Sequence, residues 1–255
     1  PTFNGTLRES QQEIYDAVDS SCIINAAPSW GKTYSGIAIA TKLGQKTLII
    51  VHTLALRGQW VKEIKKTLGI DAGVIGSGKF DIEPSIVVAN IQTISKMHLK
   101  VSEVFGTLIV DECHHCPAST FLKVVNNSKA KYKIGLSGTL ERKDGLHVLL
   151  TDLFSKTVFR PKRENMMIPT IYRVPTDVPF SDNSAIPWAH RVNDLLGRKD
   201  FFNLVVTAAA AQAARGHKVL VVSDRVFFLQ DCHEILEDNS VCITGSIKSE
   251  ERDIL

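Results

Sequence analysis

The stretch Cys22-Ile-Ile-Asn-Ala-Ala-Pro-Ser-Trp-Gly-Lys-Thr33 decides the fold that we predict for this chain. Its apolar start, Cys22 to Ile24, is typical of a buried strand, and a helical pattern runs from Tyr34 to Leu43. Between them, Ala26 to Thr33 is a near match to the phosphate-binding loop G-x-x-x-x-G-K-[ST], with alanine in place of the first glycine. Such a turn points backbone N–H groups and a helix N-terminus at an anion. The alternative is a solvated turn that contains Gly-Lys-Thr by chance.

The residue types in this loop suit nucleotide chemistry. Lys32 supplies a mobile positive charge and is predicted to be catalytic, while the hydroxyl of Thr33 can ligate Mg²⁺. The predicted nucleotide-binding residues of the loop are Ala27, Pro28, Ser29, Trp30, Gly31, Lys32 and Thr33.

Composition narrows the class of protein. The chain has 255 residues, of which 44% are hydrophobic and 22% charged, so it can bury one large core or two ordinary ones. A net charge of +3 permits a polyanionic partner without requiring one. No apolar run is long enough to span a membrane, so no membrane association is predicted. The five cysteines lack disulfide-framework spacing, which favours a reducing, cytoplasmic location.

Strand and helix patterns alternate through the first half of the chain. A short helical pattern surrounds Ile14, and a longer one runs from Thr53 to Leu68. Apolar runs typical of strands buried on both faces of a parallel sheet are Thr47–His52, Ile86–Ala89, Thr107–Glu112 and Lys133–Thr139. This alternation predicts a doubly wound α/β sheet with its ligands at the carboxyl ends of the strands.

A change in composition follows near Phe159. The segment 159–168 is polar and basic, prolines punctuate the next stretch, and we predict a linker there between residues 1–158 and a second domain, 169–255. The elements predicted in the second domain are a strand at Thr170–Val174, a helix at Asp200–Arg215, a strand at Lys218–Ser223, a helix at Val226–Leu236 and a strand at Val241–Gly245. We expect this second α/β domain to be incomplete at its C-terminus.

Two carboxylates follow a buried apolar run. Asp111 and Glu112 end the run that begins at Thr107. Mg²⁺ prefers hard oxygen ligands and usually keeps several waters, so a single carboxylate suffices to hold it. The predicted metal ligands are therefore Asp111 and the hydroxyl of Thr33. Glu112 can then orient an attacking water or accept its proton. Although a polar strand end is common by itself, its combination with a phosphate loop predicts nucleotide hydrolysis.

The four residues Cys113-His-His-Cys116 suggest a zinc site as an alternative. Structural zinc usually takes two separated ligand pairs in a tetrahedron, and four consecutive residues do not easily point at one ion. We therefore expect no zinc here.

The order of these motifs resembles that of the superfamily 2 helicases over nearly the whole chain. Leu7-Arg8-x-x-Gln11 resembles the adenine-recognising Q motif, and Asp111-Glu112-Cys113-His114 resembles a DEAH-type box. Ser137-Gly138-Thr139, followed by Arg142 to Gly145, stands where the family has Ser/Thr-Ala-Thr. Strand-contacting motifs are matched by Thr53-Leu-Ala-Leu and Ile91-Gln92-Thr93, and motif IV by Val221-Val-Ser223-Asp-Arg225, with Ile243-Thr244-Gly245 behind it. The spacing is most similar to double-strand translocases related to the TFIIH helicase subunit and to phage branch-migration helicases.

The resemblance implies two RecA-like doubly wound parallel-sheet domains, the second incomplete, with ATP and Mg²⁺ as cofactors. It implies adenine contacts from Arg8 and Gln11, and catalysis by Lys32, Asp111 and Glu112. Coupling of the γ-phosphate to the nucleic acid is implied for His114, Ser137, Gly138 and Thr139. The implied nucleic-acid contacts are Thr53, Arg57, Gln92, Thr93, Lys96, Ser223, Arg225, Thr244 and Gly245. Taken alone, each charged residue among these is a solvated surface charge.

Two departures from the family pattern shape the expectation for activity. Trp30 places bulk in a loop of small residues, and no segment after Thr244 matches motifs V or VI, whose arginines stabilise transition-state charge. We therefore expect this chain to be a fragment that binds ATP poorly and turns it over slowly by itself.

The function predicted from the sequence is that of an ATP-dependent DNA helicase or translocase, acting on branched, forked or double-stranded DNA in branch migration, recombination or repair. An RNA helicase is the nearest alternative. Other possibilities are a nucleic-acid-binding module whose degenerate loop no longer hydrolyses ATP, and a P-loop ATPase that acts on proteins.

Overall fold

The chain divides into two compact units, Pro1–Ile168 and Pro169–Leu255, in a computed structural model that describes residues 1–116, 119–140, 148–162 and 170–247. The predicted segment Arg142–Gly145 and most of the predicted linker 159–168 lie outside these described residues. No helix in the described part combines the length and the hydropathy that a membrane span needs.

The first unit is built on one sheet. Its described elements, in chain order, are α1 (Glu9–Ala17), β1 (Cys22–Asn25), α2 (Lys32–Leu43), β2 (Thr47–Val51), α3 (Leu54–Leu68), β3 (Gly73–Gly76), β4 (Lys79–Phe80), β5 (Ile86–Asn90), α4 (Ile91–Ile94), α5 (His98–Val101), β6 (Thr107–Asp111), a 3₁₀ turn (Cys113–His115), α6 (Ser119–Asn127), β7 (Tyr132–Ser137), α7 (Val148–Leu153) and β8 (Val158–Phe159). Among the described residues the strands lie in the order β4-β3-β5-β2-β6-β7-β1-β8. All neighbouring pairs are parallel except β3 and β4.

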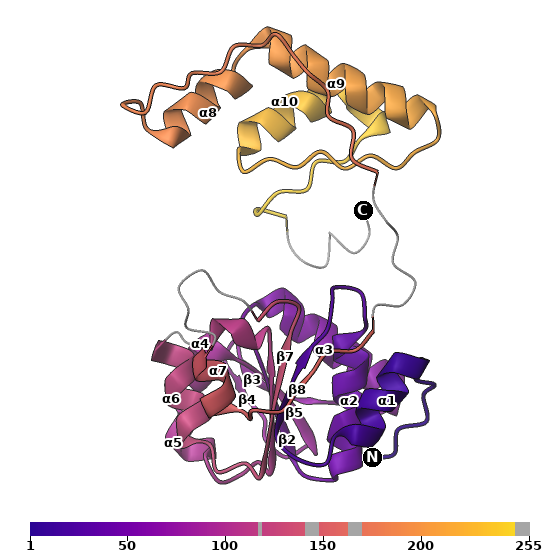
Figure 1. The fold of residues 1–255 in the computed structure, drawn as a ribbon, viewed down its shortest axis with the longest axis vertical. Coiled ribbons are helices and arrows are strands. Elements are labelled where there is room, and N and C mark those ends of the chain that lie inside the picture. The colour runs from indigo at the N-terminus through magenta and orange to yellow at the C-terminus, as the bar shows by residue number, and fades with distance from the viewer. Residues whose placement is uncertain (117–118, 141–147, 163–169, 248–255) are drawn as a thin grey trace. The chain divides into compact units, whose positions relative to one another are not determined.

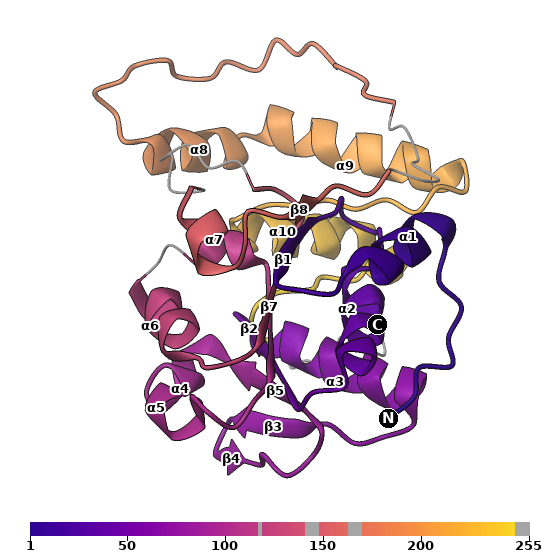
Figure 2. The same cartoon turned by 60° about the horizontal axis from the view of Figure 1, so that its bottom comes forward.

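Helices cover both faces of this sheet. Figure 1 shows α1, α2 and α3 on one face and α4 to α7 on the other, and the layers remain separate in the turned view of Figure 2. One apolar cluster lies under each set of helices, with Ile37, Trp60 and Ile64 in the first and Ile94, Phe121 and Val125 in the second. The sheet is thus the doubly wound α/β sheet predicted from the apolar runs.

The register of the sheet brings three carboxyl ends together. Asn25 at the end of β1 pairs with Ser137 at the end of β7, and Asp111 at the end of β6 pairs with Leu136 of β7. Because β6, β7 and β1 are neighbours and parallel, whatever follows Asn25, Asp111 and Ser137 must lie at one edge of the sheet.

The second unit is described by helices and extended chain. Its helices are α8 (Trp188–Leu196), α9 (Lys199–Ala214), α10 (Val226–Leu236) and a 3₁₀ turn (Glu237–Asn239). A small apolar cluster of Val206, Phe228 and Cys232 holds α9 and α10 together. The two helices predicted here are confirmed, and α8 was not predicted.

The three strands predicted in the second unit are wrong for the described residues. Thr170–Val174, Lys218–Ser223 and Val241–Gly245 carry no strand pairing. Leu220 and Val222 are 85% and 79% exposed, and only Val221 between them packs against the cluster of α9 and α10. A strand exists only when a neighbour accepts and donates its backbone hydrogen bonds, and an apolar run cannot supply that neighbour itself.

Candidate functional site

The loop between β1 and α2 is a tight turn at the edge where β6, β7 and β1 end. Ser29 and Gly31 have positive φ angles of 66° and 91°. A Cβ on Gly31 would come within 2.6 Å of Gln11 Nε2, so both the backbone angle and the space require glycine here. No side chain caps the first turn of α2, whose N-cap is Gly31, and its N–H groups therefore face the loop as donors for an anion.

Trp30 does not obstruct this loop. Its ring is buried in the apolar cluster under α1 and α2, and its Nε1 donates to Ser10 Oγ at 2.9 Å. Its backbone carbonyl accepts from Gln11 Nε2 at 2.7 Å and from the Arg8 guanidinium. The bulky side chain of Trp30 therefore anchors the loop to α1.

Arg8 and Gln11, the predicted adenine contacts, hold the loop in this structure. Gln11 uses its amide nitrogen on Trp30 and its amide oxygen on the backbone N–H of Arg8, at 2.9 Å. The structure therefore brings both residues to the loop, and their contact with adenine stays a prediction.

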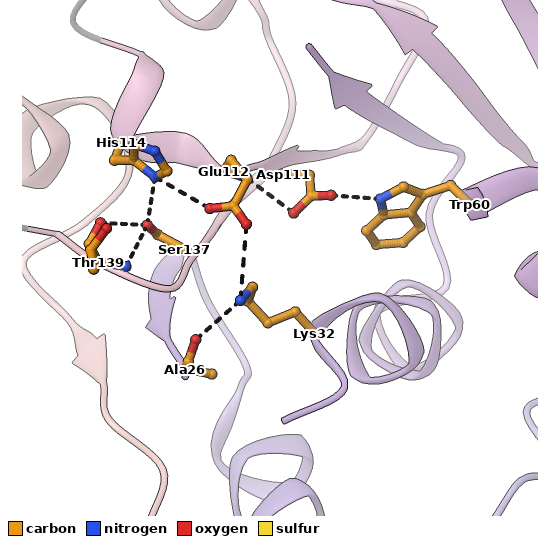
Figure 3. Close-up of polar contacts among 8 residues, drawn as sticks. All are labelled: Ala26, Lys32, Trp60, Asp111, Glu112, His114, Ser137 and Thr139. Carbon is orange, nitrogen blue, oxygen red and sulfur yellow. Dashed lines mark hydrogen bonds and ion pairs between the residues drawn. The ribbon is translucent and has the colours of Figure 1, made fainter. Parts of the chain in front are cut away.

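Lys32 reaches across from the start of α2 to the end of β6. Its Nζ donates to the carbonyl of Ala26 at 3.2 Å and lies 4.0 Å from Glu112 Oε1 (Figure 3). Gly138 lies beside the same group, where a Cβ would be 3.5 Å from Nζ. The ammonium group is therefore held over the loop by weak contacts that a phosphate can replace.

Asp111 is a buried carboxylate fixed on both oxygens. Oδ2 accepts from Trp60 Nε1 at 2.8 Å, and Oδ1 accepts from the backbone N–H of Glu112 at 3.0 Å. Burial raises the pKa of Asp111, and the hydrogen bond from Trp60 opposes that rise. Glu112 itself sits at a positive φ of 50°, a left-handed conformation that turns its carboxylate back toward Lys32 and His114.

A hydrogen-bond chain continues from Glu112 to β7. His114 Nδ1 lies 3.3 Å from Glu112 Oε2 and 2.9 Å from Ser137 Oγ (Figure 3). Ser137 Oγ donates its one hydrogen to the carbonyl of Thr139 at 2.6 Å, and it accepts from the Thr139 N–H. His114 must therefore be the donor to Ser137, which places a proton on Nδ1. The structure thus joins Lys32, Glu112, His114, Ser137 and Thr139 in one network.

The predicted nucleic-acid contacts of the first unit gather at the same end of the sheet, beyond β2 and β5. Thr53 is the N-cap of α3, where its Oγ1 accepts from the N–H of Leu56 at 3.2 Å. Gln92 Nε2 donates to the carbonyl of His52 at 3.1 Å, which ties the turn after β5 to the turn after β2. Thr93 is half-buried and Lys96 exposed on the same turn.

Arg57 is held by a turn that the sequence did not single out. Its Nη2 donates to Ser77 Oγ at 3.0 Å, in the turn between β3 and β4. Its Nη1 and Asn90 Oδ1 are buried without a hydrogen-bond partner among the described residues. The Gly76-Ser-Gly78 sequence was the available signal, because paired glycines mark a tight turn. All three residues adopt positive φ in the structure.

The predicted contacts of the second unit are engaged within that unit. Arg225 donates from Nε to Asn193 Oδ1 at 2.6 Å and pairs with Asp224 at 2.7 Å. Ser223 Oγ accepts from the backbone N–H of Arg225, and Thr244 Oγ1 lies 2.7 Å from Ser246 Oγ, beside Gly245.

The donor set fits Mg²⁺ that arrives with a nucleotide better than a resident metal ion. Among the described residues, no cluster of three or more His, Cys, Asp or Glu side chains can hold a metal. Asp111 offers one carboxylate, and Mg²⁺ characteristically takes one or two carboxylates together with phosphate oxygens and waters. Cys113 and Cys116 lie in the apolar cluster under α4 to α6, where burial raises the pKa of both thiols, while His114 lies in the polar network.

Comparisons with known proteins give a consistent assignment. The profile of a family described as "Type III restriction enzyme, res subunit" matches residues 4–142. "Probable helicase D10" of Escherichia phage T5 is 46% identical over 236 residues, which are 92% of this chain and 52% of that protein. "DNA 3'-5' translocase XPB2" of Sulfurisphaera tokodaii is 32% identical over 165 residues, 63% of this chain and 37% of that protein.

A solved structure shares the fold. The UvsW helicase of bacteriophage T4 superposes with a TM-score of 0.56 at 23% identity, covering 62% of this chain and 61% of that one. The chain spans about half the length of the phage T5 relative.

Proposed function

Because this chain belongs to the superfamily 2 helicases, in the family of the type III restriction enzyme res subunits, we propose that it is part of an ATP-driven motor that moves on DNA. The observation that supports this most is the network from Lys32 through Glu112 and His114 to Ser137. It joins the phosphate loop, the carboxylates and the third motif at one edge of the sheet. We infer that residues 1–158 form the first motor lobe, 159–168 a linker and 169–255 part of the second lobe.

Each residue of the network has a role in this proposal. ATP with Mg²⁺ supplies the phosphoryl group that is transferred to water. The N–H groups of Ala27, Ser29 and Gly31 and of the start of α2 bind phosphate oxygens, and Lys32 leaves Glu112 to neutralise the terminal phosphate. Asp111 and the Thr33 hydroxyl would supply the protein's oxygen ligands for the metal. Glu112 orients the attacking water and accepts its proton.

The same network reports the state of the nucleotide. When Lys32 moves to phosphate, Glu112 loses an ion-pair partner while it keeps His114. The Nδ1 proton of His114 is shared between Glu112 and Ser137, so a change at Glu112 alters the hydrogen bond from His114 to Ser137. Ser137 in turn bonds the carbonyl of Thr139, so the change reaches the Ser137-Gly-Thr139 turn. This turn is the bistable element by which we propose that hydrolysis reaches the rest of the motor.

DNA is the proposed track. The turns after β2 and β5 present Thr53, Gln92, Thr93 and Lys96 with backbone amides, a combination that binds the phosphodiester backbone without reading bases. Arg57 adds a cation whose contribution falls with salt. The name of a DNA translocase among the relatives supports DNA as the track. A branched or forked substrate is part of the proposal that comes from the resemblance of the motifs alone.

The test is steady-state ATP hydrolysis with and without forked DNA, by the natural chain, Lys32→Ala and Lys42→Ala. Lys42 lies at the other end of α2, where it donates to the carbonyl of Asp16 at 2.9 Å, so it is a matched control for charge. We expect DNA to stimulate hydrolysis, Lys32→Ala to lower it by at least about 10²-fold, and Lys42→Ala to leave it unchanged. The absolute rate tests the expectation of slow turnover.

The alternatives give different results in this assay. An RNA helicase responds to RNA and not to forked DNA. DNA binding that ignores both nucleotide and Lys32→Ala indicates a degenerate module, and hydrolysis that ignores nucleic acid indicates an ATPase acting on proteins. Any of these results contradicts the proposed function.

A further inference from the structure

Trp60 is a fully buried side chain that contacts Asp111 of the candidate nucleotide site from inside the apolar core. It lies in the second turn of α3, has 0% exposure, and its Nε1 donates to Asp111 Oδ2 at 2.8 Å (Figure 3). None of the sequence motifs includes it. Trp60 and Asp111 are 51 positions apart in the sequence, so no local sequence signal exists for this contact.

The same ring packs against α2, in the apolar cluster that also contains Leu136 of β7. A Cβ on Gly36 of α2 would come within 2.8 Å of Trp60 Cη2, and within 3.2 Å of Leu136 Cδ1 on β7. The indole thus fills the space that Gly36 leaves open, next to the residue that precedes Ser137. One side chain therefore contacts the helix that begins at Lys32 and the strand that ends at Asp111, beside the strand that ends at Ser137.

This geometry fixes the plane of the Asp111 carboxylate. The indole nitrogen is a donor only, so Oδ2 of Asp111 must accept the hydrogen bond from Trp60. Oδ1 accepts a second hydrogen bond, from the N–H of Glu112. A carboxylate held on both oxygens cannot rotate about its last bond without losing a buried hydrogen bond, which is unfavourable. Its remaining lone pairs then have set directions.

We infer that Trp60 is a positioning residue, which orients Asp111 toward the Mg²⁺ of the bound nucleotide. The inference rests on the proposed function, because it needs Asp111 to meet that metal. Outer hydrogen bonds of this kind orient metal ligands, and their loss typically lowers metal affinity by about 10- to 100-fold. The opposing view is that Trp60 only fills the core between α2 and α3.

The variant Trp60→Phe separates these views, because it keeps an aromatic ring and removes only the N–H group and part of the ring volume. The readout is the affinity for a fluorescent ADP, measured by anisotropy in Mg²⁺ and again in EDTA. We expect the gain in affinity that Mg²⁺ gives to fall by about 10-fold, and the affinity in EDTA to be unchanged. A core-filling residue would lower both affinities together or neither.

Two further variants control for packing. Ile64→Val removes one methyl group from a fully buried residue one turn along α3 and touches no polar atom of the site, so the Mg²⁺ effect should stay as in the natural chain. Gly36→Ala pushes the indole without changing it, and it should weaken the Mg²⁺ effect as Trp60→Phe does. Equal Mg²⁺ effects in Trp60→Phe and the natural chain overturn the inference and leave the proposed function intact. Absence of a Mg²⁺ effect in the natural chain overturns both.

A second measurement leaves Trp60 in place, in case its replacement prevents folding. The chain has three tryptophans, so a proton–nitrogen correlation NMR spectrum shows three indole N–H signals. The variants Trp30→Phe and Trp188→Phe identify two of these signals, and the remaining one belongs to Trp60. We expect the Trp60 signal to shift when ADP and Mg²⁺ are added together, and to stay in place with ADP in EDTA. A Trp60 signal that ignores Mg²⁺ overturns the inference.

Discussion

Two apolar runs of similar composition have different fates in the two units. Thr47-Leu-Ile-Ile-Val51 in the first unit and Lys218-Val-Leu-Val-Val-Ser223 in the second both predict a buried parallel strand. The first is β2, wholly buried between β5 and β6. The second is extended, unpaired and largely exposed. The difference shows that an apolar run is compatible with a strand, but the strand forms only when neighbouring strands pair with it.

The helices do not show this difference. The predicted helices at Thr53–Leu68 and Asp200–Arg215 both match the structure to within one residue at each end. A helix closes its backbone hydrogen bonds within its own segment, so it needs no distant partner to satisfy them. The helices that were predicted therefore form in both units, although α4 to α8 were not predicted, and the predicted strands form only where the sheet is present.

The largest expected difference between the two runs is in hydrogen exchange. We expect the amides of Leu48 to Val51 to exchange at least about 10⁴-fold more slowly than those of Leu220 to Val222. The amides of a core strand exchange with the global free energy of unfolding, about 5–15 kcal/mol, whereas unpaired amides exchange freely. Exchange followed by mass spectrometry on peptides from both runs measures this. Comparable protection would mean that Lys218–Ser223 pairs in solution.

The next largest difference concerns tryptophans. Trp30 is buried and hydrogen-bonded, whereas Trp188 is 64% exposed, in contact with Phe180 and Arg191. We expect Trp30→Ala to lower the free energy of unfolding of the first unit by about 3–5 kcal/mol. Trp188→Ala should cost the second unit about 1 kcal/mol or less, as expected for an exposed cation–π contact. Hydrogen exchange of the amides of α2 and of α9, measured along a urea titration, reports the free energy of unfolding of each unit separately. Equal losses of stability in Trp30→Ala and Trp188→Ala would contradict this prediction.

The smallest difference concerns two aspartates with opposite pH behaviour. Burial raises the pKa of Asp111 in the first unit, while the hydrogen bond from Arg198 lowers the pKa of Asp200 in the second. Between the ordinary pKa of aspartate and the raised value, the folded first unit binds more protons, so its stability increases as pH falls. Between the lowered and the ordinary value, the unfolded second unit binds more protons, so stability is lost as pH falls.

Carboxyl NMR titration in metal-free buffer checks the direction of each shift. Asp111→Asn and Asp200→Asn should each remove the contribution of that carboxyl group to the pH dependence of stability. Titration of Asp111 at or below the ordinary value would show that hydrogen bonds from Trp60 and Glu112 outweigh its burial.

Much of the candidate site was predictable from the sequence, because it is built from short motifs at strand ends. Parallel strands end at a common edge, so the loop before Lys32, the pair Asp111-Glu112 and the turn after Ser137 had to meet once the sheet was inferred. Their residue-by-residue roles stay predictions. The network from Glu112 through His114 to Ser137 follows the order in which the motifs were expected to couple.

The supports of the site were not predictable in the same way. Trp60 on Asp111, Trp30 on Ser10 and Ser77 on Arg57 are contacts between residues 20 to 51 positions apart, and none belongs to a repeating pattern. Their residue types are equally suited to ordinary core or surface positions. The strands β3 and β4 were missed because glycines interrupt their short apolar runs, and β8 because only two residues pair with β1.

The placement of the thiols has a practical consequence for chemical labelling. Cys22, Cys113, Cys116 and Cys232 are buried, and burial raises the pKa of each thiol, so little thiolate is present at neutral pH. Cys242 is half-buried in the second unit. A maleimide dye should therefore attach to Cys242 in the natural sequence, which gives a single fluorescent reporter in the second unit without any substitution.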